Sequence, residues 1–188
     1  MVHLSFGTDG WREVMAERFT FPNVRVVSQA IALYLRNEAN WQAGVVVGHD
    51  CRFQSDKFAE AVAEVLAGNS IRVYLVEKPT PTPVLAVCVR KLKTAGAVVI
   101  TASHNPPEYN GVKFIPDYAG PALPHITEGI EGNISWVLDS GDIKWMSLGD
   151  AASWGLVKKV DPKEDYIAHV KELVDEKAIS RAGLSVIA

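Results

Sequence analysis

The sequence predicts an α/β fold in which helices cover both faces of a β-sheet. Short, continuous apolar runs of the kind found in buried strands alternate with segments in which apolar residues recur at helical spacing. The chain is also long enough to bury a core, with 188 residues of which 48% are hydrophobic and 22% charged. This composition excludes a disordered, collagen-like or fibrous chain.

The first half of the chain predicts three strands alternating with three helices. Val24, Val27 and Ile31 form a helical stripe after Pro22, which suits the first turn of a helix. Ser55 suits the N-cap of the next helix. In order, the sequence predicts helix 22–40, strand 44–48, helix 55–68, strand 71–76, a proline-rich turn 79–83, helix 84–92 and strand 96–101.

The second half predicts further strands and helices around an irregular segment. In order, these are strand 111–115, helix 124–139, an irregular connection over 140–155, helix 161–177 and strand 183–188. Asp161 is expected to cap the last helix, with Pro162 at its first position. The final strand either opens a further domain, in which case the chain is truncated, or pairs at an edge of the same sheet.

Charge, hydropathy and cysteine content exclude several classes of protein. The chain has 19 basic and 22 acidic residues, and its basic residues are not clustered in a block, so no nucleic-acid partner is expected. The apolar runs are far shorter than a membrane span, and the N-terminus lacks the pattern of a signal peptide. Cys51 and Cys88 suggest neither a disulfide framework nor a metal site. We therefore expect a cytoplasmic protein without a membrane partner.

The most informative segment is TASHNPPEYNGVKF, which begins at Thr101 and follows a predicted strand. In α/β sheets, ligands bind beyond the carboxyl ends of the strands. The asparagine and prolines predict a rigid loop that holds Ser103 at this edge, and Gly111 is expected to let the backbone turn. A serine hydroxyl beside His104 and Lys113 suits the handling of a phosphoryl group. The alternative is a polar loop without chemistry.

Two other segments contain candidate residues. FGTDGWRE presents Arg12 from a predicted turn, and arginine can bind phosphate with two parallel hydrogen bonds. In GHDCR, Asp50 and Arg52 are expected to pair and brace neighbouring loops. A serine-hydrolase function is disfavoured because adjacent side chains rarely face each other as nucleophile and base, and because no G-x-S-x-G motif is present. A nucleotide-binding function lacks both a P-loop and a G-x-G-x-x-G motif.

Together, FGTDGWRE, GHDCR and TASHNPPEYNGVKF resemble the first domain of the α-D-phosphohexomutases, which include phosphoglucomutases and phosphomannomutases. The resemblance covers about residues 3–160. It implies a three-layer α/β/α sandwich with a mixed, largely parallel sheet. It further implies that residues 1–160 form domain I with the phosphoserine loop. Residues 161–188 would be the linker helix and first strand of a truncated domain II.

The resemblance also implies a reaction. Ser103 would be the phosphoserine that gives its phosphoryl group to a hexose phosphate, forming a 1,6-bisphosphate, and then takes back the other phosphoryl group. Mg²⁺ would contact the Ser103 phosphate, with its other ligands absent from this chain, and glucose 1,6-bisphosphate would act as activator and intermediate. Arg12, His104 and Lys113 would bind substrate or assist proton transfer.

Asp50 and Arg52 would belong to the motif that lines and braces the cleft for substrate phosphate. The expected partners are a hexose phosphate and the remaining domains of the same polypeptide, and the chain alone is expected to have little or no mutase turnover. The competing hypothesis is a non-catalytic phosphosugar-binding or interaction module on the same scaffold. Which hexose phosphate is preferred stays open.

Overall fold

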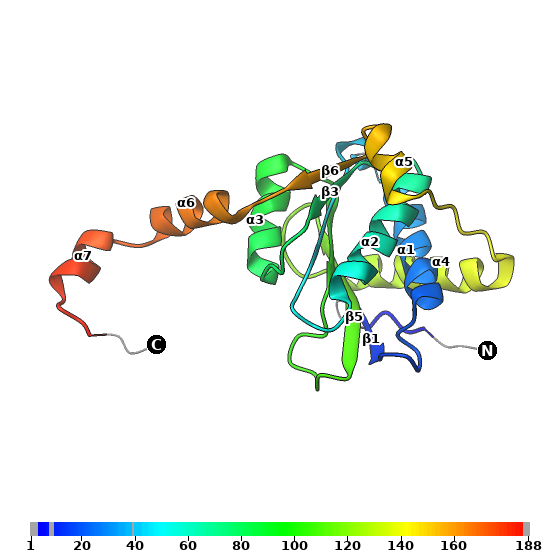
Figure 1. Cartoon of the computed structure of the whole chain (residues 1–188), viewed down its shortest axis with the longest axis horizontal. Helices are drawn as coiled ribbons and strands as arrows, with labels where there is room; N and C mark the ends of the chain where they lie inside the picture. Colours follow the sequence, from blue (N-terminus) through cyan, green and yellow to red (C-terminus); the bar gives the residue numbers. More distant parts are fainter. Residues whose placement is uncertain (1–3, 8–9, 39, 186–188) are drawn as a thin grey trace.

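The computed structural model describes residues 4–7, 10–38 and 40–185, and a six-stranded sheet lies at the centre of this described part (Figure 1). The strand order across the sheet is β1-β5-β4-β2-β3-β6. The strands are β1 (Gly10–Val14), β2 (Val45–His49), β3 (Val73–Val76), β4 (Gly96–Ile100), β5 (Tyr109–Pro116) and β6 (Val157–Val160).

The sheet is mixed but largely parallel. Strands β4, β2, β3 and β6 pair in parallel, whereas β5 is antiparallel to both β4 and β1. Because two antiparallel steps restore the direction, β1 points the same way as the four parallel strands. Only β5 runs in the opposite sense.

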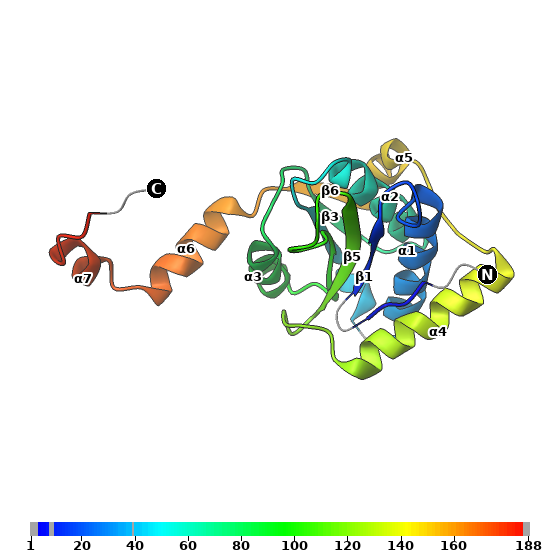
Figure 2. The ribbon, with the colours of Figure 1, turned by 90° about the horizontal axis from the view of Figure 1, so that it is seen from below.

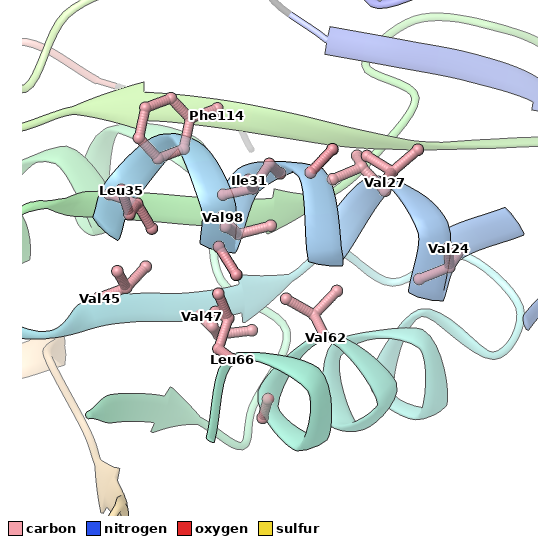
Figure 3. Close-up of a cluster of buried hydrophobic side chains, with 14 of the residues drawn as sticks. Val24, Val27, Ile31, Leu35, Val45, Val47, Val62, Leu66, Val98 and Phe114 are labelled. Atoms are coloured by element: carbon pink, nitrogen blue, oxygen red, sulfur yellow. The ribbon is translucent and has the colours of Figure 1, made fainter. Parts of the chain in front are cut away.

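Helices cover both faces, which confirms the predicted α/β/α sandwich. One face carries α1 (Phe21–Arg36), α2 (Ser55–Gly68), α4 (Pro124–Ser140) and α5 (Leu148–Ser153), and the other carries α3 (Thr82–Leu92) (Figure 2). The larger core cluster lies between α1, α2 and the sheet, as the labelled side chains in Figure 3 show. Successive residues of β2 point to opposite faces, so Val45 and Val47 join this cluster and Val46 joins the smaller one beneath α3.

The structure contains short elements that the sequence did not predict, among them β1, β6, α5 and the 3-10 helix η1 (Trp41–Ala43). Strand β1 lies in the segment expected to be a turn around Arg12, and β6 and α5 lie in or just after the segment expected to be irregular. Strands β1 and β6 are at the two edges of the sheet and carry charged residues, so their apolar pattern is weak. Only pairing with a neighbouring strand identifies them.

The predicted cap of α2 was wrong. Gln54 occupies the N-cap position without a side-chain hydrogen bond, and Ser55 is the first helical residue. The Ser55 side chain is instead buried and donates a hydrogen bond to Oδ1 of Asp50 at 2.9 Å. The Ser55 side chain therefore stabilises the loop before α2 and does not cap the N-terminus of the helix.

The predicted helix over residues 161–177 is two helices, α6 (Lys163–Leu173) and α7 (Glu176–Arg181), which project away from the sheet (Figure 1). The chain is extended at Val174, and Asp175 caps α7 by accepting from two backbone amides. Asp161 lies one residue before the N-cap, Pro162, and its side chain accepts a hydrogen bond from the amide of Lys163. The expected strand 183–188 extends beyond the described residues, and its described part is not a strand.

None of the described helices is long and apolar enough to cross a membrane.

The two cysteines are expected to differ strongly in reactivity. Cys51 is exposed, whereas Cys88 of α3 is buried, and burial raises the pKa of its thiol to about 11. Because the thiolate is the reactive form, at pH 8 Cys88 has roughly 100-fold less of it than an ordinary thiol. Iodoacetamide should therefore modify Cys51 alone, as followed by intact mass. Unfolding the protein in guanidinium should release both sites, and equal modification in the folded protein would contradict the prediction.

Candidate active site

Two loops meet at the carboxyl edge of the parallel strands. Residues 50–54 follow β2, and residues 101–108 connect β4 to β5. Strands β2 and β4 pair in parallel with His49 opposite Ile100, and the amide of Asp50 donates to the carbonyl of Ile100 at 3.0 Å. The two polar segments singled out in the sequence are therefore neighbours.

Ser103 is exposed at the tip of the second loop, in a strained backbone conformation. Its φ is +55°, in the left-handed region, which costs a non-glycine residue about 1–2 kcal/mol. Its amide donates to Oγ1 of Thr101 at 3.0 Å, which holds the turn. Strain of this kind persists only where surrounding contacts hold the chain, and it is common in functional loops.

His104 lies against this serine, contrary to the expectation that the two adjacent side chains would not face each other. Oγ of Ser103 and Nδ1 of His104 are 3.3 Å apart. The imidazole can therefore exchange a proton with the serine hydroxyl or donate to a group carried on it. Among the described residues, no carboxylate hydrogen-bonds to the other ring nitrogen, so these residues form no Ser-His-Asp triad.

Arg52 holds the shape of the serine loop. Its two terminal nitrogens donate to four backbone carbonyls at 2.6–3.0 Å, those of Ser103, Asn105, Pro106 and Tyr109. Its Nε lies 3.4 Å from Oδ2 of Asp50, so the guanidinium also forms an ion pair with that carboxylate. These contacts with the loop carbonyls are those of a residue that braces the loop.

Replacing Arg52 with lysine should therefore destabilise the protein although the charge is kept. A lysine ammonium has a single charged centre and cannot reproduce the planar fork, so we expect the free energy of unfolding to fall by about 2–3 kcal/mol. Arg18→Lys is the matched control, because the Arg18 side chain is exposed and forms an ion pair with Glu13 at 3.5 Å. Denaturant titration measures both variants, and equal changes in stability would refute the bracing role.

Arg12 and Lys113 lie beside the loop on neighbouring strands. In the β1–β5 ladder Arg12 pairs with Gly111, and Lys113 pairs with Gly10. The residues next to them, Trp11 and Val112, are buried in the larger core, so both cations lie on the opposite face of the sheet. Both residues have interactions within the protein.

Gly111 lies within β5, not in the turn that the sequence suggested. Its φ is not in the left-handed region, so close approach rather than backbone freedom requires glycine. A Cβ at this position would lie 2.6 Å from the carbonyl oxygen of Thr101 and 2.8 Å from Cγ of Arg12. The stem of Arg12 therefore crosses over Gly111, next to the strand end that leads to the serine loop.

Sequence reasoning did not assign a role at the site to three polar residues that the structure places beneath these loops. His49 is buried, with its two ring nitrogens 2.9 and 3.2 Å from the carbonyl oxygens of Asp50 and Glu77. Ser55 and Asn110 are buried and hydrogen-bonded to each other. The available signal was a polar residue within or beside an apolar run, which local spacing does not distinguish from a surface position.

The described residues do not by themselves form a magnesium site. No group of three or more histidine, cysteine, aspartate or glutamate side chains among them is placed to hold a metal ion. Mg²⁺ prefers six oxygen ligands in octahedral geometry, several of them water or phosphate. A phosphate on Ser103 would supply only part of such a set.

Comparison with known proteins places the chain in a family. The family model "Phosphoglucomutase/phosphomannomutase, alpha/beta/alpha domain I" matches residues 3–137. A phosphoglucomutase of Staphylococcus saprophyticus is 34% identical over 161 residues, covering 77% of this chain and 29% of the relative. A probable phosphomannomutase of Haemophilus influenzae is 32% identical over 163 residues, covering 85% of this chain and 31% of the relative.

Solved structures agree with this assignment. The crystal structure of a putative phosphomannomutase from Thermus thermophilus matches with a TM-score of 0.85 and 36% identity, over 99% of this chain and 39% of that one. The open form of parafusin from Paramecium, at 22% identity and a TM-score of 0.74, shares the fold over 91% of this chain and 35% of that one. The chain spans about 30% of the length of its curated relatives. It belongs to the phosphoglucomutase/phosphomannomutase family and has the α/β/α architecture of that family's domain I.

Proposed function

We propose that this chain is the phosphoryl-carrying domain of a phosphohexomutase and that Ser103 is the residue that carries the phosphoryl group. The observation that supports this most is the serine loop itself. An exposed serine is held in a strained conformation by four carbonyl contacts to Arg52, with His104 at 3.3 Å, in a chain of this family. Such a loop presents one hydroxyl at a fixed place, which in-line phosphoryl transfer requires.

The proposed reaction interconverts hexose 1-phosphate and 6-phosphate. Starting from phosphorylated Ser103, the bond from phosphorus to Oγ breaks as a bond forms to the free sugar hydroxyl, whose proton is removed while the Ser103 oxygen gains one. The sugar bisphosphate then reorients. The bond from its other phosphorus to the sugar oxygen breaks as a bond forms to Oγ of Ser103, and the serine proton passes to the sugar oxygen that is released. The phosphate count of the enzyme is unchanged after one cycle.

The residues around Ser103 have distinct proposed roles. His104 holds or moves the proton of the serine hydroxyl, because its Nδ1 is within reach of Oγ. Arg12 and Lys113 offer positive charge on the adjoining strands, which stabilises phosphate oxygens. Asp50 and Arg52 act through the loop, because their contacts are with the protein itself.

We further propose that the mutase cycle needs the longer polypeptide seen in the relatives. Sugar contacts and the ligands of a divalent cation at the Ser103 phosphate would come from outside the described residues. The isolated chain is then expected to accept a phosphoryl group while showing little or no mutase turnover.

The test is the intact mass of the chain before and after incubation with glucose 1,6-bisphosphate and Mg²⁺. We expect a gain of one phosphoryl group, which fragmentation maps to Ser103. A phosphoryl group on another residue, or robust mutase turnover by a variant without Ser103, would contradict the proposal. Binding of the sugar phosphate without transfer would instead favour the non-catalytic binding module.

A further inference from the structure

A buried chain of hydrogen bonds lies beneath the serine loop. Oδ1 of Asp50 accepts from Oγ of Ser55 at 2.9 Å, and Oγ of Ser55 accepts from Nδ2 of Asn110 at 2.9 Å. Oδ1 of Asn110 then accepts from the amide of Gly111 at 2.8 Å. Residues from the start of α2 and the start of β5 are thus linked to the carboxylate of Asp50.

This chain closes into a ring through the serine loop. The carbonyl of Gly111 accepts from the amide of Thr101 at 3.0 Å, and Oγ1 of Thr101 accepts from the amide of Ser103 at 3.0 Å. The carbonyl of Ser103 accepts from Arg52 at 3.0 Å, and Arg52 contacts Asp50 through both Nε and its amide. The ring therefore begins and ends at Asp50, and it fastens the loop at its tip and at its base.

The buried part of the ring is shielded from solvent, and the Ser55 hydroxyl has its one donor engaged. Ser55 and Asn110 are both 0% exposed. The Ser55 hydroxyl donates one bond and accepts one, and the second Nδ2 hydrogen of Asn110 has Sδ of Met15 at 4.0 Å. No water can reach these atoms to replace a lost partner, so removing either side chain leaves its neighbours unsatisfied.

We infer that Ser55 and Asn110 are positioning residues for Ser103. Their side-chain hydrogen bonds join Asp50, Gly111 and each other, and they reach Ser103 only through the ring. They fix the carboxylate of Asp50, Asp50 fixes Arg52, and Arg52 fixes the carbonyls of the loop. That the positioned serine carries a phosphoryl group rests on the proposed function, whereas the ring itself does not.

Hydrogen exchange of the complete chain tests the inference. In Ser55→Ala, the loop amides of Ser103, Asn105 and Tyr109 should exchange about tenfold faster than in the parent protein. Ser28→Ala is the matched control. Ser28 is also a 0% exposed serine, but its hydroxyl donates to Val24 within its own helix at 2.7 Å. The control should leave the loop amides unchanged.

Two more measurements keep the test decisive. Ser55→Cys fills the site with a slightly larger thiol and weakens the hydrogen bonds, so it should loosen the same three amides even if the alanine variant does not fold. The rate of phosphoryl uptake from glucose 1,6-bisphosphate should fall about tenfold in the Ser55 variants and not in Ser28→Ala. Unchanged loop exchange in the Ser55 variants, or equal loosening in the control, would overturn the inference. Absence of uptake in the parent chain would count against the proposed function alone, because the exchange comparison still tests the ring.

Discussion

Replacing Ser103 with alanine should reduce phosphoryl uptake by at least about 10³-fold, because the variant lacks the oxygen to which the phosphoryl group is transferred. The fold should persist, since the Ser103 side chain is exposed and its hydroxyl bonds to the neighbouring His104. The contacts to Arg52 use the backbone carbonyl of residue 103, so the loop should keep its shape. Intact mass after incubation with glucose 1,6-bisphosphate and Mg²⁺ measures the uptake.

Ser70→Ala is the matched control for this variant. Ser70 is likewise an exposed serine with a left-handed backbone, at φ +63°, but it lies before β3 and outside the candidate site. It should take up one phosphoryl group as the parent chain does. Persistent uptake by the Ser103 variant would show that another residue accepts the group. Loss of uptake in both variants would point to the strained backbone rather than the hydroxyl.

Replacing Gly111 with alanine should destabilise the protein by roughly 3 kcal/mol. The added methyl group would lie 2.6 Å from the carbonyl oxygen of Thr101 and 2.8 Å from that of Trp11. One oxygen belongs to the residue that follows β4 and the other to β1, the two strands that flank β5. Neither oxygen can move away without disturbing the sheet. The stem of Arg12, at 2.8 Å, would also be displaced, so phosphoryl uptake should fall together with stability.

Gly132→Ala is the matched control, because the same substitution is expected to stabilise the protein there. Gly132 lies in α4, and a Cβ there would meet nothing within 4 Å. Alanine should raise the free energy of unfolding by about 0.5–1 kcal/mol, because glycine loses more backbone entropy in a helix. Denaturant unfolding of both variants checks the pair. Similar stabilities would mean that the sheet adapts to a side chain at residue 111.

Much of the fold could be predicted because its main elements have strong local patterns. The apolar spacing of α1, the β-branched run of β2 and the proline-rich turn before α3 each identify an element without reference to the rest of the chain. The fold class follows, because alternating helices and buried strands can hide their apolar surfaces only in a layered sheet. Edge strands β1 and β6 escaped prediction because half-exposed strands have a weaker pattern.

In the candidate site, too, local features could be predicted from the sequence, whereas contacts between distant segments could not. The residue types of Ser103, His104 and Lys113 and their closeness in the sequence were enough to predict a loop that handles phosphate. Arg52 contacts residues 51 to 57 positions away, and Asn110 contacts a serine 55 positions away. Spacing within a segment does not predict such pairs, because they form only when strands from distant parts of the chain align. The sequence by itself therefore determined the elements with strong local patterns, and it predicted the candidate residues Ser103, His104 and Lys113. The pairing of β2, β4 and β5 decided that Asp50, Ser55 and Asn110 come together beneath the serine loop, because strand register sets which residues meet across a sheet.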